Sequence, residues 1–294
     1  MLSLLIPTVA QGLLWALMAL GVYVTFRVLD IADLTVEGSF PLGAATAASM
    51  MVAGFRPLTA LLAAFVAGML AGVVTGLLHT KMKIPALLAG ILTMIALYSV
   101  NLRIMGKANL SLLGVDTAFK LAKSALDLSM AQTTLVVGLA ATLIVGFFMY
   151  WFFGTQIGAA IRATGFNQQM IRAQGVDTDI TIILGLLLSN GLVAVSGALV
   201  AQSNGFSDVG MGTGTIVIGL ASVIIGEVLF GTRSFKNCLI SVVLGSIVYR
   251  IVIAAVLAMG MPPNDLKLFT SVLVALALSM PLIKAKMGGR KAVR

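Results

Sequence analysis

Charged and amide side chains inside otherwise apolar runs are the residues of this sequence that could do chemistry. Glu37 lies just inside an interrupted apolar segment, Glu227 lies late in another, and Arg250 lies beyond the midpoint of a third. Ionisable groups in apolar spans are costly, so they often mark the pathway of a solute or an ion. An acid and an arginine could complement the ammonium and carboxylate of a zwitterion. The candidate pathway residues are Asp33, Glu37, Asn101, Asn190, Glu227 and Arg250.

The same residues also have a structural interpretation. Glu37 and Glu227 could cap broken helices or pair with neighbouring cations, and Arg250 could extend its guanidinium toward the membrane interface. The sequence leaves both interpretations open for each of these side chains.

A second group of polar residues forms a short connection between two apolar runs, within residues 154–178. Asn167 is a good N-cap, because its side chain can accept a backbone N–H two or three residues later. Gly175 can adopt the left-handed conformation that closes a helix. The two residues therefore bracket about two turns of helix over 168–174, with Met170 and Ile171 on one side. A helix this short is marginal in water, so we expect it either to dock onto a partner or to pack on its own bundle.

The sequence offers no sign of an enzyme or a metal centre. A phosphate-binding loop needs a Gly-x-x-x-x-Gly-Lys-Ser/Thr pattern, but Gly106-Lys107 is followed by Ala108. The single histidine, His79, stands near lysines at the end of an apolar run, and the single cysteine, Cys238, excludes an intramolecular disulfide. We expect no cofactor and no metal on this chain.

The composition defines the elements that must hold these residues. Of 294 residues, 60% are hydrophobic and 10% are charged, whereas soluble domains carry about 25% charged residues. We predict an all-α membrane protein, a single domain over 1–294 with roughly eight to ten spans of ~20 residues. The predicted spans are 4–26, 34–52, 57–78, 84–100, 132–153, 180–201, 213–230, 237–259 and 268–283. The span at 34–52 is the weakest, since glycine and proline interrupt it, and we expect a broken or re-entrant helix there.

The net charge of +9 does not indicate a nucleic-acid partner, because the basic residues lie between the apolar runs and in a basic tail over 284–294. Their distribution favours a cytoplasmic C-terminus. The first apolar run has no basic flank before it and no small-residue cleavage pattern after it, so we expect it to be retained as a span. In that orientation the cytoplasmic side carries the tail together with Arg27, Lys81, Lys83, Arg162, Arg172, Arg233 and Lys236. The outer side carries Arg56, Arg103, Lys107, Lys120, Lys123 and Lys267.

Two further patterns bear on helix packing. Residues 33–48 and 208–223 each place an aspartate ahead of a segment rich in glycine and small residues, which is either a faint inverted repeat or a chance similarity. Small residues at Gly68, Gly72 and within 191–198 favour close helix contacts.

The loop within residues 154–178 resembles that of a known family. The residues Gly158, Arg162, Ala163, Gly165, Asn167, Gly175 and Val176 match the coupling-helix pattern of the branched-chain amino acid/ribose group of ATP-binding-cassette (ABC) permeases. The resemblance continues over roughly 12–285, through Gly210–Gly214 and the segment 33–43. The contexts of Glu37 and Glu227 are most similar to permeases named for tryptophan or tyrosine transport.

The resemblance implies a type II-like importer permease in the bacterial inner membrane. Its partners would be a cytoplasmic ATPase that binds ATP and Mg²⁺, an extracytoplasmic solute-binding protein and a second copy of the chain. The coupling residues would be Arg162, Gly165, Asn167, Met170, Ile171, Arg172 and Gly175. The expected cargo is a small solute, in the first place an amino acid, with an aromatic one as first choice. The alternatives are a sugar or nucleoside permease, an ion-coupled secondary transporter, or a membrane scaffold or receptor that transports nothing.

Overall fold

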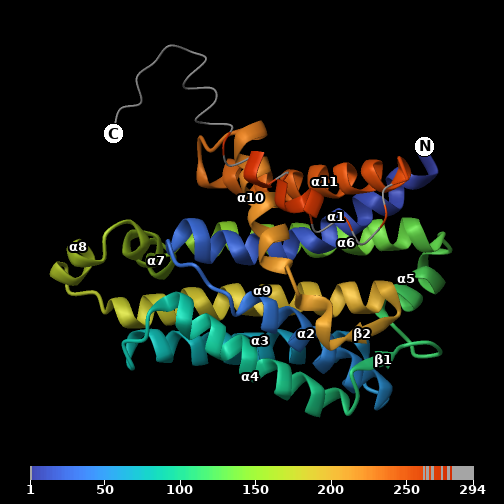
Figure 1. Ribbon diagram of the computed structural model, residues 1–294, viewed down its shortest axis with the longest axis horizontal. Coiled ribbons are helices and arrows are strands. Elements are labelled where there is room, and N and C mark those ends of the chain that lie inside the picture. Colours follow the sequence, from blue (N-terminus) through green and yellow to red (C-terminus); the bar gives the residue numbers. More distant parts are fainter. Residues whose placement is uncertain are drawn as a thin grey trace.

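The computed structural model describes residues 2–260, 262, 265, 268–272, 274–276 and 279. Long helices run almost parallel through the molecule and form one bundle (Figure 1). The spanning helices are α1 (Leu2–Tyr23, continued by the π-helical η1, Val24–Val28), α3 (Pro57–Thr80), α4 (Ala86–Met105), α6 (Met130–Gly154), α9 (Thr178–Asn204), α10 (Thr215–Phe230) and α11 (Phe235–Ala258). In the described part of the chain, 7 helices are long and apolar enough to cross a membrane. Of the predicted span at 268–283, residues 268–272, 274–276 and 279 are described and are helical, whereas the tail at 284–294 lies wholly outside the described residues.

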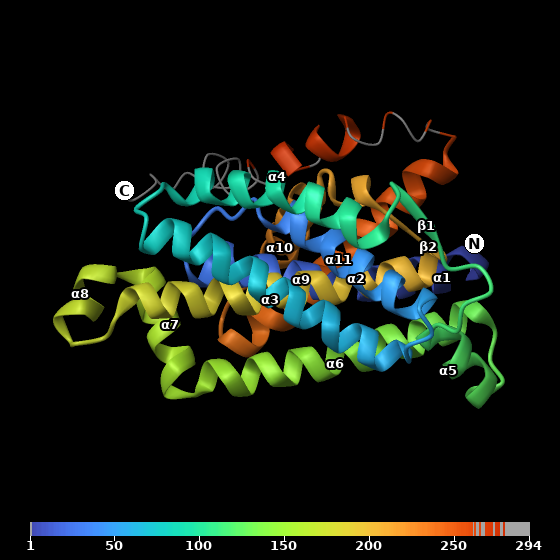
Figure 2. The same ribbon diagram turned by 90° about the horizontal axis from the view of Figure 1, so that it is seen from below.

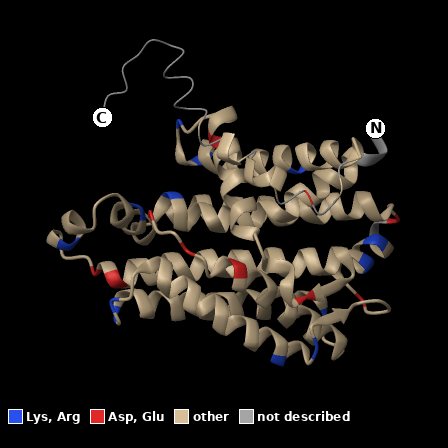
Figure 3. Ribbon diagram, viewed as in Figure 1, with Lys and Arg blue, Asp and Glu red and all other residues tan. Residues whose placement is uncertain are grey.

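The two ends of the bundle differ. One end, the α8 end, carries the short helices α7 (Gln156–Phe166) and α8 (Gln168–Ala173). The other, the β end, carries α5 (Ala118–Leu126) and the antiparallel strands β1 (Asn109–Ser111) and β2 (Phe206–Asp208) (Figures 1 and 2). Basic residues gather at both ends (Figure 3). The helix order places the described members of the group predicted to be cytoplasmic at the α8 end, and the described members of the outer group at the β end.

Helix α9 forms the centre of the bundle because its surface is apolar or small on nearly every side. Helices α1, α2 and α3 pack around it. Glycines allow the closest approaches, and the close helix contacts predicted at Gly68 and Gly72 are present. A Cβ on Gly68 would lie 2.4 Å from the carbonyl oxygen of Asn190, and one on Gly72 would lie 2.3 Å from that of Leu186. Helices α4 and α6 turn large apolar side chains outward, as lipid-facing helices do.

Helix α2 (Val36–Val52) and helix α10 both begin inside the bundle. A non-helical stretch leads from the α8 end to α2, and β2 with the 3₁₀ turn η2 (Val209–Gly212) leads from the β end to α10 (Figure 1). An aspartate fixes the backbone of the segment that leads into each helix. Asp33 accepts the N–H of Thr35 at 2.9 Å, and Asp208 accepts the N–H of Gly210 at 2.7 Å. The predicted interruption of the second segment lies before Val36 and not at its glycines and proline, because α2 continues for 17 residues through Gly38, Pro41 and Gly43. In each of the two similar sequence segments, an aspartate that accepts a backbone N–H precedes a helix.

Helices α5 and α7 and the two strands were not predicted from the sequence. Distant partners hold α5 and the strands in place. The backbone N–H of Ala118 at the start of α5 donates to the Gln202 side chain at 2.9 Å, and Phe119 is fully buried. A short helix fixed in this way owes little to its own propensity.

The close approach at Gly72 gives the first prediction. Replacing Gly72 by alanine should lower the free energy of unfolding by roughly 1–3 kcal/mol, since the new methyl group meets a backbone carbonyl that cannot move away. Gly146→Ala is the matched control, because a Cβ there meets nothing within 4 Å and alanine favours the helix. Thermal unfolding in detergent would compare the two variants. Equal stability of both would contradict the packing described above.

Candidate transport pathway and coupling site

The N-terminal ends of α2 and α10 meet around Glu37. Its Oε1 accepts the backbone N–H of Gly214 at 3.0 Å. A Cβ on Gly212 would lie 1.9 Å from the carbonyl oxygen of Glu37, so only glycine fits there. Helices α2 and α10 therefore direct their positive ends toward a carboxylate in the middle of the bundle, which stabilises its negative charge.

A groove of about 410 Å³ opens beside Glu37. Its polar lining comes from α4 and from the approach to α10, and its apolar lining includes Met94 and Ile95. Asn101 is fully buried, donates to the Gly38 carbonyl at 3.3 Å and lines the same groove. Tyr98, Ser99 and Thr213 were missed in the sequence, although Tyr98 and Ser99 lie within three residues of Asn101 on α4.

Arg250 lines a neighbouring cavity of about 350 Å³, which shares Thr213 with the groove beside Glu37. Its guanidinium carbon lies 4.1 Å from the centre of the Trp15 ring. Its Nε has no hydrogen-bond partner among the described residues. Glu37 and Arg250 therefore line adjoining cavities.

Asp33 and Asn190 occupy a separate, fully enclosed network. The Asn190 side-chain amide donates to Asp33 at 2.8 Å, and Ser39 donates to Asn190 at 2.6 Å. Asp33 and Asn190 are buried beneath α2 and line neither of the two cavities just described. They hold the start of α2 in place.

Glu227 is far along α10 from Glu37. It accepts a bidentate contact from Arg27, with Nε 2.8 Å from Oε1, at the α8 end. This pair joins the end of α1 to the end of α10. The sequence shows no sign of the partnership, because the two residues are separated by 200 positions.

The loop between α6 and α9 has the caps predicted for it. The Asn167 side chain accepts the N–H of Met170 at 3.0 Å, and Gly175 has φ +85°. Helix α8 covers Gln168–Ala173, and α7 precedes it. Ile171 is buried, whereas Met170 is 44% exposed and Phe166 is 90% exposed. An apolar surface therefore remains uncovered at the tip of the loop.

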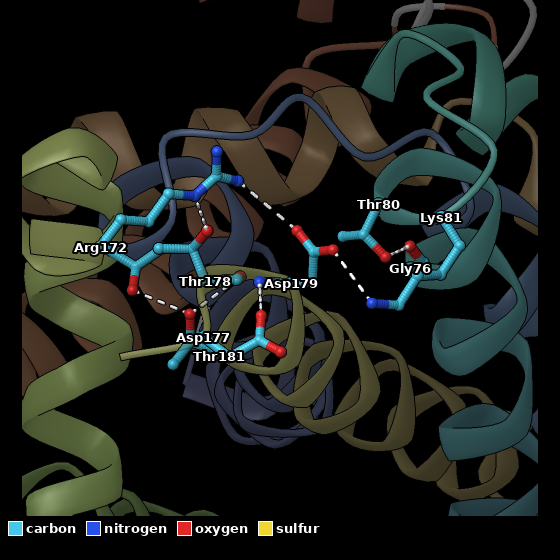
Figure 4. A network of polar contacts seen from close by, with 9 residues as sticks. Gly76, Thr80, Lys81, Arg172, Asp177, Thr178, Asp179 and Thr181 are labelled. Atoms are coloured by element: carbon cyan, nitrogen blue, oxygen red, sulfur yellow. Dashed lines mark hydrogen bonds and ion pairs between the residues drawn. The ribbon is translucent and has the colours of Figure 1, made fainter. Parts of the chain in front are cut away.

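The loop is tied to the bundle by polar and close contacts. Arg172 donates from Nε to Thr178 at 2.5 Å and lies 3.5 Å from Asp179, and Lys81 pairs with the same aspartate at 3.1 Å (Figure 4). Arg162 lies over the ring of Phe235 at 5.3 Å. A Cβ on Gly165 would lie 1.9 Å from the Val28 carbonyl oxygen, so this glycine packs α7 against η1.

The bundle, its broken helices and the intramembrane cavities define the class of protein: a polytopic permease. Residues 4–279 match the model of the branched-chain amino acid transport system / permease component family, and the chain belongs to that family. It is the permease component of an ABC importer and acts with an ATPase in a transporter complex; it is not itself the ATPase. The family assignment decides against an ion-coupled transporter and a scaffold.

Relatives support this assignment. The chain is 41% identical over 273 residues to the tyrosine transport system permease protein of Clostridioides difficile, covering 93% of this chain and 90% of the relative. It is 30% identical over 271 residues to the galactofuranose transporter permease protein of Escherichia coli, covering 90% and 75%.

A structure titled as an inward-facing conformation of a metal-chelate type ABC transporter aligns with a TM-score of 0.50 at 16% identity, covering 96% of this chain and 85% of that one. At that identity the likeness concerns the fold alone. The all-helical, type II-like permease fold predicted from the sequence is confirmed.

Proposed function

We propose that the chain imports an amino acid, with an aromatic one as first choice, along a pathway beside the N-terminal ends of α2 and α10. The observation that carries this proposal is the Glu37 carboxylate on a groove of about 410 Å³ in the middle of the bundle. The name of the tyrosine permease relative supports the choice of solute.

In this proposal the two ends of the solute meet opposite charges. Glu37 receives the ammonium group, and Arg250 receives the carboxylate in the adjoining cavity. Met94, Ile95 and Tyr98 supply apolar and aromatic surface for the side chain of the solute. Asn101 lines the groove, while Asp33 and Asn190 act as positioning residues for α2. The Arg27–Glu227 pair closes the α8 end.

The direct test is uptake into liposomes that contain the permease, its ATPase and its binding protein. Labelled tyrosine should accumulate when ATP is present. Excess unlabelled tryptophan should compete with it, and ribose or galactose should not. Accumulation of a sugar in place of tyrosine would contradict the amino-acid assignment and favour the cargo named for the Escherichia coli relative.

The two ends of the bundle differ, so each can bind a different partner. We propose that the tip of the α7–α8 loop, with Phe166 and Met170, enters the cytoplasmic ATPase, which carries ATP and Mg²⁺. The solute-binding protein docks at the β end, and a second copy of the chain completes the pathway. The protein lies in the bacterial inner membrane with its α8 end and C-terminus in the cytoplasm.

Sidedness can be tested with single cysteines in a Cys238→Ser background. Gln174→Cys, beside α8, should react with a membrane-impermeant maleimide only in inverted vesicles. Asp116→Cys, next to α5, should react only from the outside, because the two positions lie at opposite ends of the bundle. Both residues are exposed or half-exposed. Labelling of both from one side would contradict the proposed orientation.

A further inference from the structure

An apolar trough runs along the outside of the bundle between α6 and α11. Both helices pack on α1, and α1 forms the floor with Leu13 and Leu20. The trough has a volume of about 380 Å³, and its walls are mostly leucine, isoleucine, valine and phenylalanine. It shares no lining residue with the cavities beside Glu37 and Arg250. It therefore lies apart from the proposed solute pathway.

The trough has the depth of one membrane leaflet. On α6 its wall extends from Leu139 to Tyr150, which at a helical rise of about 1.5 Å per residue spans about 16 Å. Half of a hydrocarbon core about 30 Å thick is about 15 Å. Because Tyr150 and Lys236 lie near the α8 end of their helices, the trough occupies the leaflet on that side.

One cation lies at a mouth of the trough, and two more are close to it in space or in the sequence. Lys236 is part of its lining. Arg162 lies over the ring of the adjacent Phe235, and Arg233 stands three positions before Lys236. All three cations are exposed, and none of them pairs with a carboxylate in the described part of the chain. Basic sites between helices on the cytoplasmic side are suited to anionic lipid headgroups.

We infer that this trough binds one anionic phospholipid of the leaflet at the α8 end. An acyl chain lies between α6 and α11 along the floor formed by α1, and the phosphate lies near Lys236. Gly146 leaves space for the acyl chain, because a Cβ at that position would meet nothing within 4 Å. The acyl chain bridges α6 and α11, and α6 leads directly into α7 of the coupling loop.

Native mass spectrometry of the full chain in a mild detergent, titrated with phosphatidylglycerol or phosphatidylcholine, tests the inference. The wild-type chain should retain phosphatidylglycerol more tightly, by roughly fivefold for each cation near the phosphate. Lys236→Gln should lower that preference roughly fivefold. Lys83→Gln, which removes an exposed cation at the same end but away from the trough, should leave it unchanged.

Two variants that fill the trough test the acyl-chain site. Gly146→Leu should abolish specific retention of both lipids, and Leu143→Trp, at a 63% exposed position of the same wall, provides a second obstruction. Ala140→Leu, on an exposed part of α6 outside the trough lining, is the control. Unchanged retention in both filled variants would overturn the site. Binding without a preference for phosphatidylglycerol would overturn the role of Lys236. If the filled variants lose the dimer but retain the lipid, the trough binds a second copy of the chain and not a lipid.

Discussion

Glu37→Gln should abolish most solute uptake while leaving the fold intact. The glutamine side chain keeps an oxygen that can accept the Gly214 N–H, which Glu37 accepts at 3.0 Å. The substitution removes the negative charge and replaces the other carboxylate oxygen by an NH₂ group. A hydrogen bond to a charged group contributes about 1.5–3 kcal/mol, so the passage of a zwitterion should slow by roughly 10- to 150-fold.

Asp33→Asn provides the contrast for this experiment. The Asp33 carboxylate is enclosed and accepts from both Thr35 and Asn190, so the amide NH₂ of asparagine would face one of these donors. We expect Asp33→Asn to lose thermal stability and uptake together, because a buried polar group without a partner costs about 1–3 kcal/mol. Uptake of labelled tyrosine and thermal unfolding should be measured for both variants and for Arg250→Gln.

The outcomes separate the two roles of the intramembrane charges. If Glu37→Gln loses stability in proportion to its activity, the charge is structural. If its uptake is normal, neutral groups such as Asn101 and Thr213 line the pathway, and the solute carries no charge that matters for passage. Either result would contradict the assignment of Glu37 to the ammonium group.

Phe166→Asp should separate the permease from its ATPase. Phe166 is 90% exposed at the tip of the α7–α8 loop, and an aromatic residue at the centre of an interface commonly contributes at least 2 kcal/mol. We expect the affinity for the ATPase to fall by roughly 30-fold or more, with a matching loss of permease-stimulated ATP hydrolysis. Met170→Asp should act in the same direction.

Co-purification and ATPase assays would measure these effects, with Gln169→Ala on the exposed surface of α8 as the control. Substitutions of Arg172 or Gly165 are less direct tests. Arg172→Glu would place a carboxylate beside Asp179, and any side chain at Gly165 would collide with the Val28 carbonyl. Normal association of Phe166→Asp and Met170→Asp would mean that the loop is only a connection between α6 and α9.

For the loop between α6 and α9, the residues alone predict a capped helix, and the family resemblance adds the hypothesis that this helix couples to the ATPase. Asn167 and Gly175 predict a capped helix by local geometry, and the structure has it. The tip residue Phe166 was not singled out, because exposure depends on how α7 and α8 turn away from the bundle. The signal that could have identified it is its position between two helices.

The sequence by itself determined that this is a helical membrane protein, roughly where its spans lie, and which capping residues close the loop at α8. Those features follow from runs of apolar residues, from the cost of charge in lipid and from hydrogen bonds between near neighbours in the chain. Only the tertiary structure decided how the six candidate pathway residues divide. Asp33 and Asn190 are enclosed, Glu37 and Asn101 share a groove, Arg250 lines the next cavity, and Glu227 pairs with Arg27. A polar side chain in a span needs a partner, but that partner comes from another helix. It lies 157 positions away for Asp33–Asn190 and 200 positions away for Arg27–Glu227, so no local pattern in the sequence identifies it.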